Sequence, residues 1–291
     1  MSELPGLIIN GMLTGGLHAL IALPMVLVYK ATQVVSIAHG QILALGAFIF
    51  WLTLHWLPFG PSLIICLVLI GLLGFIIERL ALRPLIGQPL FSAFMVTFGL
   101  FMFFDGIFQL LLVGKARAIP VFFSGSTEVV GATVSISDVG TFGISLAIFL
   151  TVWLFFRYSK VGLGMRATAE DHRLAQSAGI NVRLIFSIAW IFSAVVAALA
   201  GITAAQVVSV YISLPWMIVK GLVVALVGGL DSMRGALVAG LILGVLERIA
   251  AFYVDPLVGG GTAEIVPFIL LLFIVLARPY GLFGLARIER I

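Results

Sequence analysis

Long apolar runs dominate the chain, and polar residues gather in a few short stretches between them. A helix needs about 20 mostly apolar residues to cross the hydrocarbon core of a bilayer. By that length the pattern predicts eight membrane helices, over residues 5–29, 34–56, 61–80, 90–113, 139–157, 184–208, 235–254 and 264–278. A ninth apolar segment, residues 217–230, is short for a crossing and carries Lys220, so we expect a half-helix or a tilted short span.

Composition agrees with this pattern. The 291 residues are 62% hydrophobic and 10% charged, whereas soluble domains carry about 25% charged residues. Because the apolar runs are long and do not alternate with polar residues, we predict an all-α, polytopic transmembrane bundle and not a barrel. We expect one domain over residues 1–291, with some elements broken or re-entrant. The net charge of +4 gives no sign of nucleic-acid binding, and the expected surroundings are membrane lipid.

Lysine and arginine in short loops predict which side of the membrane each loop faces. Three basic groups are separated by even numbers of spans, so all three can be cytoplasmic. They are Arg79 and Arg83; Arg157, Lys160, Arg166, Arg173 and Arg183; and Arg278, Arg287 and Arg290. The loop 157–183 and the C-terminus are therefore expected on the cytoplasmic side, and residues 114–138 outside as a short hairpin. The pattern leaves the side of the N-terminus open.

Two stretches interrupt the apolar pattern in corresponding places, residues 34–48 and 225–244. Each follows an apolar segment and precedes a helix rich in small residues, which is a weak internal repeat. Paired interruptions of this kind indicate a transport pathway at a repeat interface, because irregular backbone is tolerated at membrane depth only inside protein or beside water. The candidate pathway residues here are Ser36, His39, Gly40 and Gln41. The alternative is that these side chains only tie two helices together near the cytoplasmic interface.

Polar residues also follow one face of the first span. Asn10, Thr14 and His18 are spaced by four, so they share a helix face that is expected to point into the bundle or a cavity. They are the second set of candidate pathway residues, and hydrogen bonding between helices without solute contact is the alternative. Asp105 is a candidate intramembrane carboxylate. Glu247 is interpreted as an interfacial or interhelical residue without a direct function.

A polar helix is predicted near residues 168–178, within a cytoplasmic loop of about 158–183. Thr168 suits the N-cap, with Asp171 completing a capping-box pattern. Gly179 suits the C′ position that ends a helix, and Asn181 can cap the helix that follows. The helix is too short and too polar to span. It is suited to docking in a groove of another protein, and a helix lying on the membrane surface is the alternative.

Several motifs together resemble one transporter family. They are "NGMLTGGLHALIAL", "SIAHGQILALGAF", "MRATAEDHRLAQSAGINV", "GGLDSMRGALVAGLILGVLE" and "RPYGLFG". The spacing from Ala175 to Gly179 resembles the EAA-type loop of bacterial ABC import permeases, with Arg173 where the motif usually has glutamate. The whole chain resembles a LivH-like permease subunit of the branched-chain (hydrophobic) amino acid ABC transporter family.

The resemblance implies a non-enzymatic importer subunit of the bacterial inner membrane. Its implied partners are a second permease, expected to be a longer LivM-like paralogue, two ATP-binding subunits, and a periplasmic or lipid-anchored solute-binding protein. The chain would need no cofactor or metal, since ATP would be bound by the partner subunits. The polar loop would be the ATPase-coupling element, formed by Glu170, Arg173, Leu174, Ala175, Ala178, Gly179 and Asn181.

The nature of the solute stays open at this point. The resemblance implies amino acids, branched-chain or hydrophobic ones, as the first expectation, and urea, short amides and aromatic acids are alternatives. An ion-coupled secondary transporter would need carboxylates within the spans, and Asp105 is the only good candidate in the sequence. A membrane enzyme is disfavoured because the four histidines are scattered and show no metal-ligand spacing.

Overall fold

The structure is a computed structural model that describes residues 4–85, 88–129, 132–170 and 172–284. Six of its helices are long and apolar enough to cross a membrane. They are α1 (Leu4–Thr32), α3 (Phe59–Ile77), α4 (Leu90–Leu112), α5 (Ile136–Tyr158), α8 (Val182–Val208) and α10 (Met233–Tyr253). Three shorter apolar helices are α2 (His39–Thr53), α9 (Met217–Gly228) and α12 (Thr262–Ala277).

The remaining elements are short. They are α6 (Lys160–Glu170), α7 (His172–Ser177), α11 (Asp255–Val258), the π-helical turn η1 (Glu78–Leu82), the 3-10 turns η2 (Arg83–Leu85) and η3 (Leu214–Trp216), and the strands β1 (Ser126–Val129) and β2 (Ala132–Ser135). The predicted all-α bundle is confirmed, and each of the nine predicted apolar segments corresponds to one helix of the described chain.

The predictions of full spans over residues 34–56 and 264–278 are wrong, because α2 and α12 are shorter than a straight crossing needs, whereas the break predicted after the first span is present at residues 33–38. Helix α1 ends at Thr32, where Gln33 adopts a left-handed backbone with φ of 61°, and the chain is not helical again until His39. Helix α2 therefore has only 15 residues, a length of about 22 Å, which is short of the roughly 30 Å hydrocarbon core. The apolar content of the segment was predicted correctly, but its backbone is broken.

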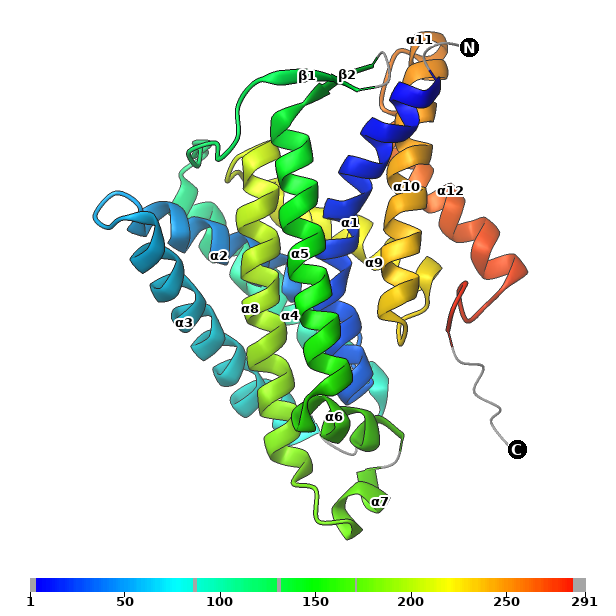
Figure 1. The fold of residues 1–291 in the computed structure, drawn as a ribbon. Helices are drawn as coiled ribbons and strands as arrows, with labels where there is room; N and C mark the ends of the chain where they lie inside the picture. The colour runs from blue at the N-terminus through cyan, green and yellow to red at the C-terminus, as the bar shows by residue number, and fades with distance from the viewer. Residues whose placement is uncertain (1–3, 86–87, 130–131, 171, 285–291) are drawn as a thin grey trace.

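Helix α1 lies inside the bundle and packs against α5, α8, α9 and α10 (Figure 1). Its closest approach is to α10, where glycines face glycines. A Cβ added to Gly15 would lie 2.6 Å from the carbonyl oxygen of Gly240, and Gly11 meets the backbone of Gly244 and Val245 in the same way. Helices that expose glycines four residues apart can bring their backbones into contact, which is the common way of packing helices in membranes.

The two ends of the bundle differ (Figure 1). At one end lie the N-terminus, α11 and the antiparallel pair β1–β2, in which Ser126 pairs with Ser135. The prediction of a hairpin within residues 114–138 is thus confirmed. At this end the Asp255 carboxylate accepts hydrogen bonds from the backbone N–H of Thr262 at 3.0 Å and from its hydroxyl at 2.5 Å, which hold the pKa of that carboxyl below its usual range. Helices α6 and α7 lie at the opposite end, called the α7 end below.

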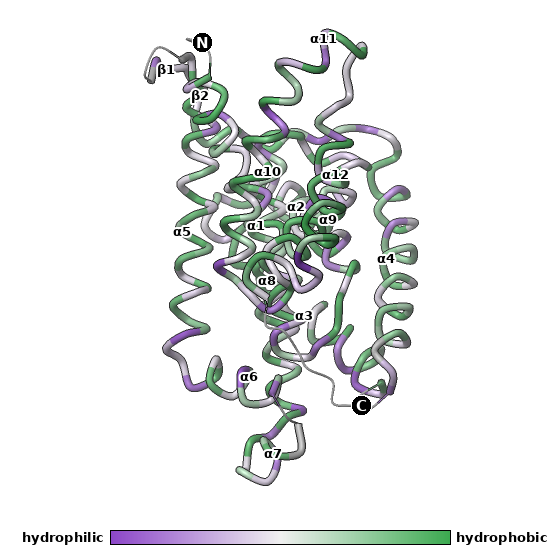
Figure 2. The backbone as a smooth tube through the Cα atoms, turned by 90° about the vertical axis from the view of Figure 1, so that its right-hand side faces the viewer, coloured by the Kyte–Doolittle hydropathy of each residue, from purple (hydrophilic) through white to green (hydrophobic). Residues whose placement is uncertain are grey.

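The surface of the bundle is apolar over much of its length. Figure 2 shows hydrophobic residues predominating along the long helices, with hydrophilic ones gathered in the connections. Exposed large side chains include Ile64 on α3, Phe103 on α4 and Leu276 on α12. In water such a surface would be costly, and in lipid it is not. The described structure therefore has the exterior of a multi-pass membrane protein.

Candidate functional site

The polar face predicted on α1 starts half-buried near the hairpin end and becomes buried deeper in the bundle. The amide of Asn10 donates to the carbonyl oxygen of Gly6 at 3.0 Å, and the hydroxyl of Thr14 donates to that of Gly11 at 3.0 Å. Both side chains therefore satisfy their donors within their own helix, as Ser and Thr often do in membrane helices. His18 lies further in and is 6% exposed.

His18 lies beside a partly buried charge pair, and together the three side chains connect three helices. Its Nε2 lies 3.7 Å from a carboxylate oxygen of Glu247 on α10, and the other oxygen lies 3.1 Å from the Nζ of Lys220 on α9. The Lys220 Nζ also lies 3.8 Å from the exposed Glu264 at the start of α12. The interpretation of Glu247 as an interhelical residue is confirmed. Charged groups held inside a membrane bundle are costly and frequently functional.

The sequence analysis assigned no pathway role to Lys220 or Glu247. Each is a charged residue within an apolar segment, which the sequence alone shows. Their pairing was not visible, because α9 and α10 are joined by a turn whose geometry the sequence pattern does not fix. With His18 they form a polar cluster between α1, α9 and α10.

The second predicted group, around the break between α1 and α2, is buried. The two ring nitrogens of His39 lie 3.0 Å from the hydroxyl of Ser36 and 2.5 Å from that of Ser193 on α8. The ring also packs against Trp190, with 5.0 Å between centroids. Ser36, His39 and Ser193 are 0% exposed, so the non-helical segment is anchored to α8 by hydrogen bonds, as backbone breaks inside membranes require.

The neighbours of His39 complete this anchor. A Cβ at Gly40 would lie 2.6 Å from the carbonyl oxygen of Pro215, so only glycine fits against η3 without a shift. The Gln41 amide donates to Asp105 on α4 at 2.7 Å, and Gln109 donates to the other oxygen of the same carboxylate at 2.6 Å. Asp105 thus accepts from two neutral amides: the hydrogen bond from Gln41 connects α2 and α4, and the one from Gln109 lies within α4.

The predicted helix over residues 168–178 has different boundaries in the structure. Helix α6 already begins at Lys160 and contains Thr168, and α7 covers His172–Ser177. The prediction that Thr168 is the N-cap is wrong: its side chain is buried in α6 and its hydroxyl donates to the carbonyl oxygen of Gly164 at 2.8 Å. Asp171, the other half of the predicted capping box, lies outside the described residues, as does the side chain of Arg173.

The end of α7 agrees with the sequence analysis. Gly179 has φ of 82°, and the Ile180 N–H donates to the carbonyl oxygen of Ala175 at 3.0 Å, which is the Schellman ending expected for a C′ glycine. Asn181 caps α8 by accepting from the Leu184 N–H at 3.1 Å. Both local predictions are confirmed.

The apolar face predicted on this element is divided. Ala175 is buried, in a small cluster with Val182 and Phe186 of α8, so it fixes α7 to the rest of the chain. Leu174 is 68% exposed, and Ala178 and Glu170 are exposed as well. Helix α7 projects beyond the end of the bundle in both views (Figures 1 and 2). Its outward surface is available to another protein, while its inward surface is already occupied.

These features define a multi-pass α-helical membrane protein with charged groups held inside its bundle and a small helical projection at one end. The chain belongs to the family described as branched-chain amino acid transport system / permease component, whose sequence profile matches residues 7–275. The predicted resemblance to LivH-like permeases is thereby confirmed. A transport permease moves a solute and is not an enzyme.

Named relatives cover almost the whole chain. The high-affinity branched-chain amino acid transport system permease protein LivH of Salmonella typhimurium is 27% identical over 300 residues, which are 97% of this chain and 96% of the relative. The corresponding BraD protein of Pseudomonas aeruginosa is 27% identical over 305 residues, 98% of this chain and 97% of the relative. A probable LivH of Methanocaldococcus jannaschii is 27% identical over 285 residues, 92% of this chain and 89% of the relative.

Proposed function

We propose that this chain is the permease subunit of an ABC importer that moves branched-chain or other hydrophobic amino acids into the cell. The observation that carries the proposal is membership of the permease family over residues 7–275, supported by relatives with that named role along nearly their full length. In this proposal the energy comes from ATP hydrolysis in two separate ATP-binding subunits. A solute-binding protein delivers the amino acid, and a LivM-like permease is the second membrane subunit.

The distribution of basic residues supports an orientation in the plasma membrane. Arg157, Lys160 and Arg183 belong to the α7 end, and short loops rich in Lys and Arg face the cytoplasm. We therefore place α6 and α7 inside the cell, together with the C-terminus, and the β1–β2 hairpin outside. The terminal arginines Arg287 and Arg290 lie outside the described residues and add to this argument only by sequence.

We further propose that the two sets of candidate pathway residues have different roles. Asn10 and Thr14 on α1 lead from the outer end toward His18 and the Lys220–Glu247 pair, and they are half-buried on a helix surrounded by other helices. This face is suited to line the path of a zwitterionic solute when the second permease subunit is present. Ser36, His39, Gly40 and Gln41 are buried and bonded to neighbouring helices, which suits a supporting role beside that path.

Helices α6 and α7 are the proposed coupling element. The exposed residues Glu170, Leu174 and Ala178 would enter a groove on the ATP-binding subunit. Ala175, Gly179 and Asn181 would set the position of this surface from within the chain. Closure of the ATP-binding subunits would then move α6 and α7 against the bundle and switch the permease between two states.

The test is solute-stimulated ATP hydrolysis by the assembled complex. We expect Leu174→Glu to reduce stimulation to the basal rate, because a charge would replace the exposed apolar side chain at the docking surface. Leu257→Glu is the matched control, since Leu257 is also strongly exposed, at 82%, but lies in α11 at the opposite end. Full stimulation in both variants would refute the coupling role of α7.

A further inference from the structure

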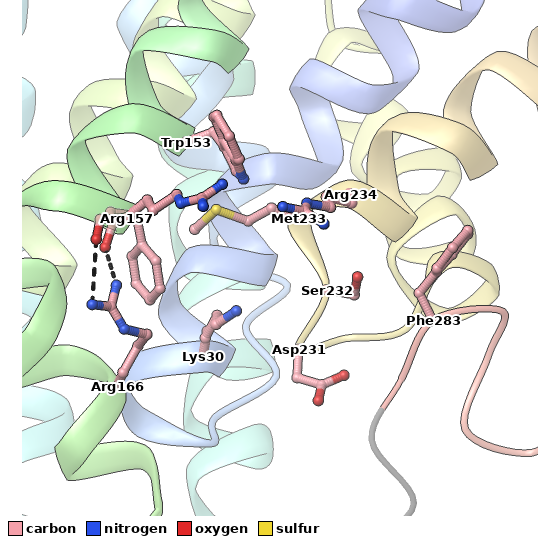
Figure 3. A pocket seen from close by; sticks show the side chains of 10 residues that line it. Lys30, Trp153, Arg157, Arg166, Asp231, Ser232, Met233, Arg234 and Phe283 are labelled. Carbon is pink, nitrogen blue, oxygen red and sulfur yellow. Dashed lines mark hydrogen bonds between the residues drawn. The ribbon is translucent and has the colours of Figure 1, made fainter.

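A cavity of about 400 Å³ lies at the α7 end, between α1, α5, α6 and the turn that precedes α10 (Figure 3). Four of the side chains that line it are cationic, and one is a carboxylate. The cations are Lys30 of α1, Arg157 of α5, Arg166 of α6 and Arg234 of α10, and the carboxylate is Asp231. Among the described residues, the lining thus carries three more positive than negative charges, and the four cations come from four different helices.

Aromatic rings and carbonyl groups hold these cations in place without neutralising them. Arg157 and Arg234 lie over the ring of Trp153, at 5.2 and 5.6 Å from its centroid. Lys30 and Arg166 lie over the ring of Phe156, at 5.1 and 5.5 Å. The Arg166 guanidinium also donates to the carbonyl oxygens of Phe156 and Arg157 (Figure 3). Cation–π contacts position a charge, so the excess positive charge remains.

Helix α10 adds a further positive field. It begins at Met233, and its N-cap residue Ser232 lines the cavity. The first N–H groups of a helix favour an anion at this position. A tetrahedral oxyanion could accept hydrogen bonds from several donors of this lining at once.

We propose that this cavity binds a phosphate group, and that the phosphate belongs to the head group of an anionic phospholipid from the surrounding leaflet. The outer surface of α5 favours this source. Leu150, Leu154 and Tyr158 are 45%, 46% and 71% exposed, and their spacing puts them in one stripe that ends beside Arg157. An acyl chain can follow this stripe while the head group occupies the basic cavity, as anionic lipids do in basic pockets between membrane helices.

The bound lipid would connect α1, α5, α6 and α10, and would thereby link the coupling element to the bundle. This inference needs the membrane orientation but not the identity of the transported solute. The experiment below measures lipid retention. The lipid site can therefore be refuted while the proposed transport function stands, and the transport function can be refuted while the lipid site stands.

The experiment is native mass spectrometry of the full-length protein in detergent, with equal amounts of phosphatidylglycerol and phosphatidylcholine. The wild-type protein should retain phosphatidylglycerol preferentially. Arg234→Gln and Lys30→Met should each weaken this retention about fivefold, since each cation near a lipid surface contributes about 1 kcal/mol. Arg234→Lys should retain the lipid, and Asp231→Asn should retain more of it.

Arg183→Gln is the matched control, because Arg183 is exposed at the same end but does not line the cavity. Equal retention in the Arg234→Gln and Arg183→Gln proteins would overturn the site. Binding of inorganic phosphate without a preference for phosphatidylglycerol would overturn the lipid as its source. Binding of leucine in place of either would overturn the phosphate assignment, and would make the cavity part of the solute path.

Discussion

Glu78 shows how a single residue can hold two membrane helices together. It is 1% exposed, and Arg83 donates to both of its carboxylate oxygens at 3.0 Å. The hydroxyl of Ser187 on α8 also donates to it at 2.8 Å. A buried carboxylate is tolerated only when its charge and its lone pairs are met in this way. The group therefore fixes the π-helical end of α3 against α8.

Removing Arg83 should destabilise the protein, because it leaves the buried Glu78 carboxylate unpaired. We expect Arg83→Met to lower the free energy of unfolding in detergent by about 3 kcal/mol, because the Glu78 charge would remain buried without its partner. Arg79→Met is the control, since Arg79 is exposed and lies four residues earlier, in η1. Adding Glu78→Gln to Arg83→Met should recover part of the loss. Equal melting temperatures for both arginine variants would contradict this account.

Thr14 gives a test of the proposed pathway. We expect Thr14→Leu to lower amino acid uptake about tenfold without loss of assembly, since a larger side chain on this face would narrow the path. Thr151→Leu on α5 is the matched control, because Thr151 also donates to the carbonyl oxygen four residues before it, at 2.8 Å, but is exposed on the outside of α5. Normal uptake by the Thr14→Leu protein would mean that Thr14 only packs.

Residues that act locally were the predictable ones. Gly179 and Asn181 were recognised because a helix end depends on a few neighbouring residues. The Lys220–Glu247 pair and the His39–Ser193 contact join helices far apart in sequence, and one sequence carries no direct record of such pairing. Thr168 was assigned to the wrong role for a related reason: its cap pattern was present, but packing of α6 on the bundle extended the helix past it.

At the scale of elements, the contact between α1 and α10 depends on glycine. We expect Gly15→Ala to destabilise the fold by about 2 kcal/mol, because the new methyl group would meet the backbone of α10. Gly143→Ala on α5 is the control, since no described atom lies within 4 Å of a Cβ added there. That change should be neutral or slightly stabilising, as alanine favours helices. The measurement is the fraction of folded protein on heating in detergent.

The opposite outcome is equally clear. If both glycine variants unfold at the same temperature as the wild type, the backbone contact between α1 and α10 is not tight.

The sequence hints at this contact, since both helices carry glycines four residues apart, but it does not say which helices meet. The element boundaries were well predicted where apolar runs are long. For α2 an interruption was predicted within residues 34–48, but the start of the break, at the left-handed Gln33, was not.

At the scale of the whole molecule, the class of protein follows from composition and the number of apolar segments alone. What the sequence could not supply is the arrangement in space: α1 inside the bundle, charges from α9 and α10 meeting His18, and α7 projecting at one end (Figure 1). These depend on packing between distant segments. The separation of the candidate residues into a half-buried set on α1 and a buried set around His39 also became visible only with the fold.

The central claim is that α7 contacts an ATP-binding subunit on the inner side of the membrane, and site-specific cross-linking tests it most directly. The native Cys66 is buried, so a single cysteine at the exposed position Ala178 can be compared with one at the exposed Ser126 of β1, at the opposite end. In the assembled transporter, we expect a cross-link from Ala178→Cys to the ATP-binding subunit and none from Ser126→Cys. Labelling of Ala178→Cys from outside the cell, or an assembled complex without that cross-link, would contradict it.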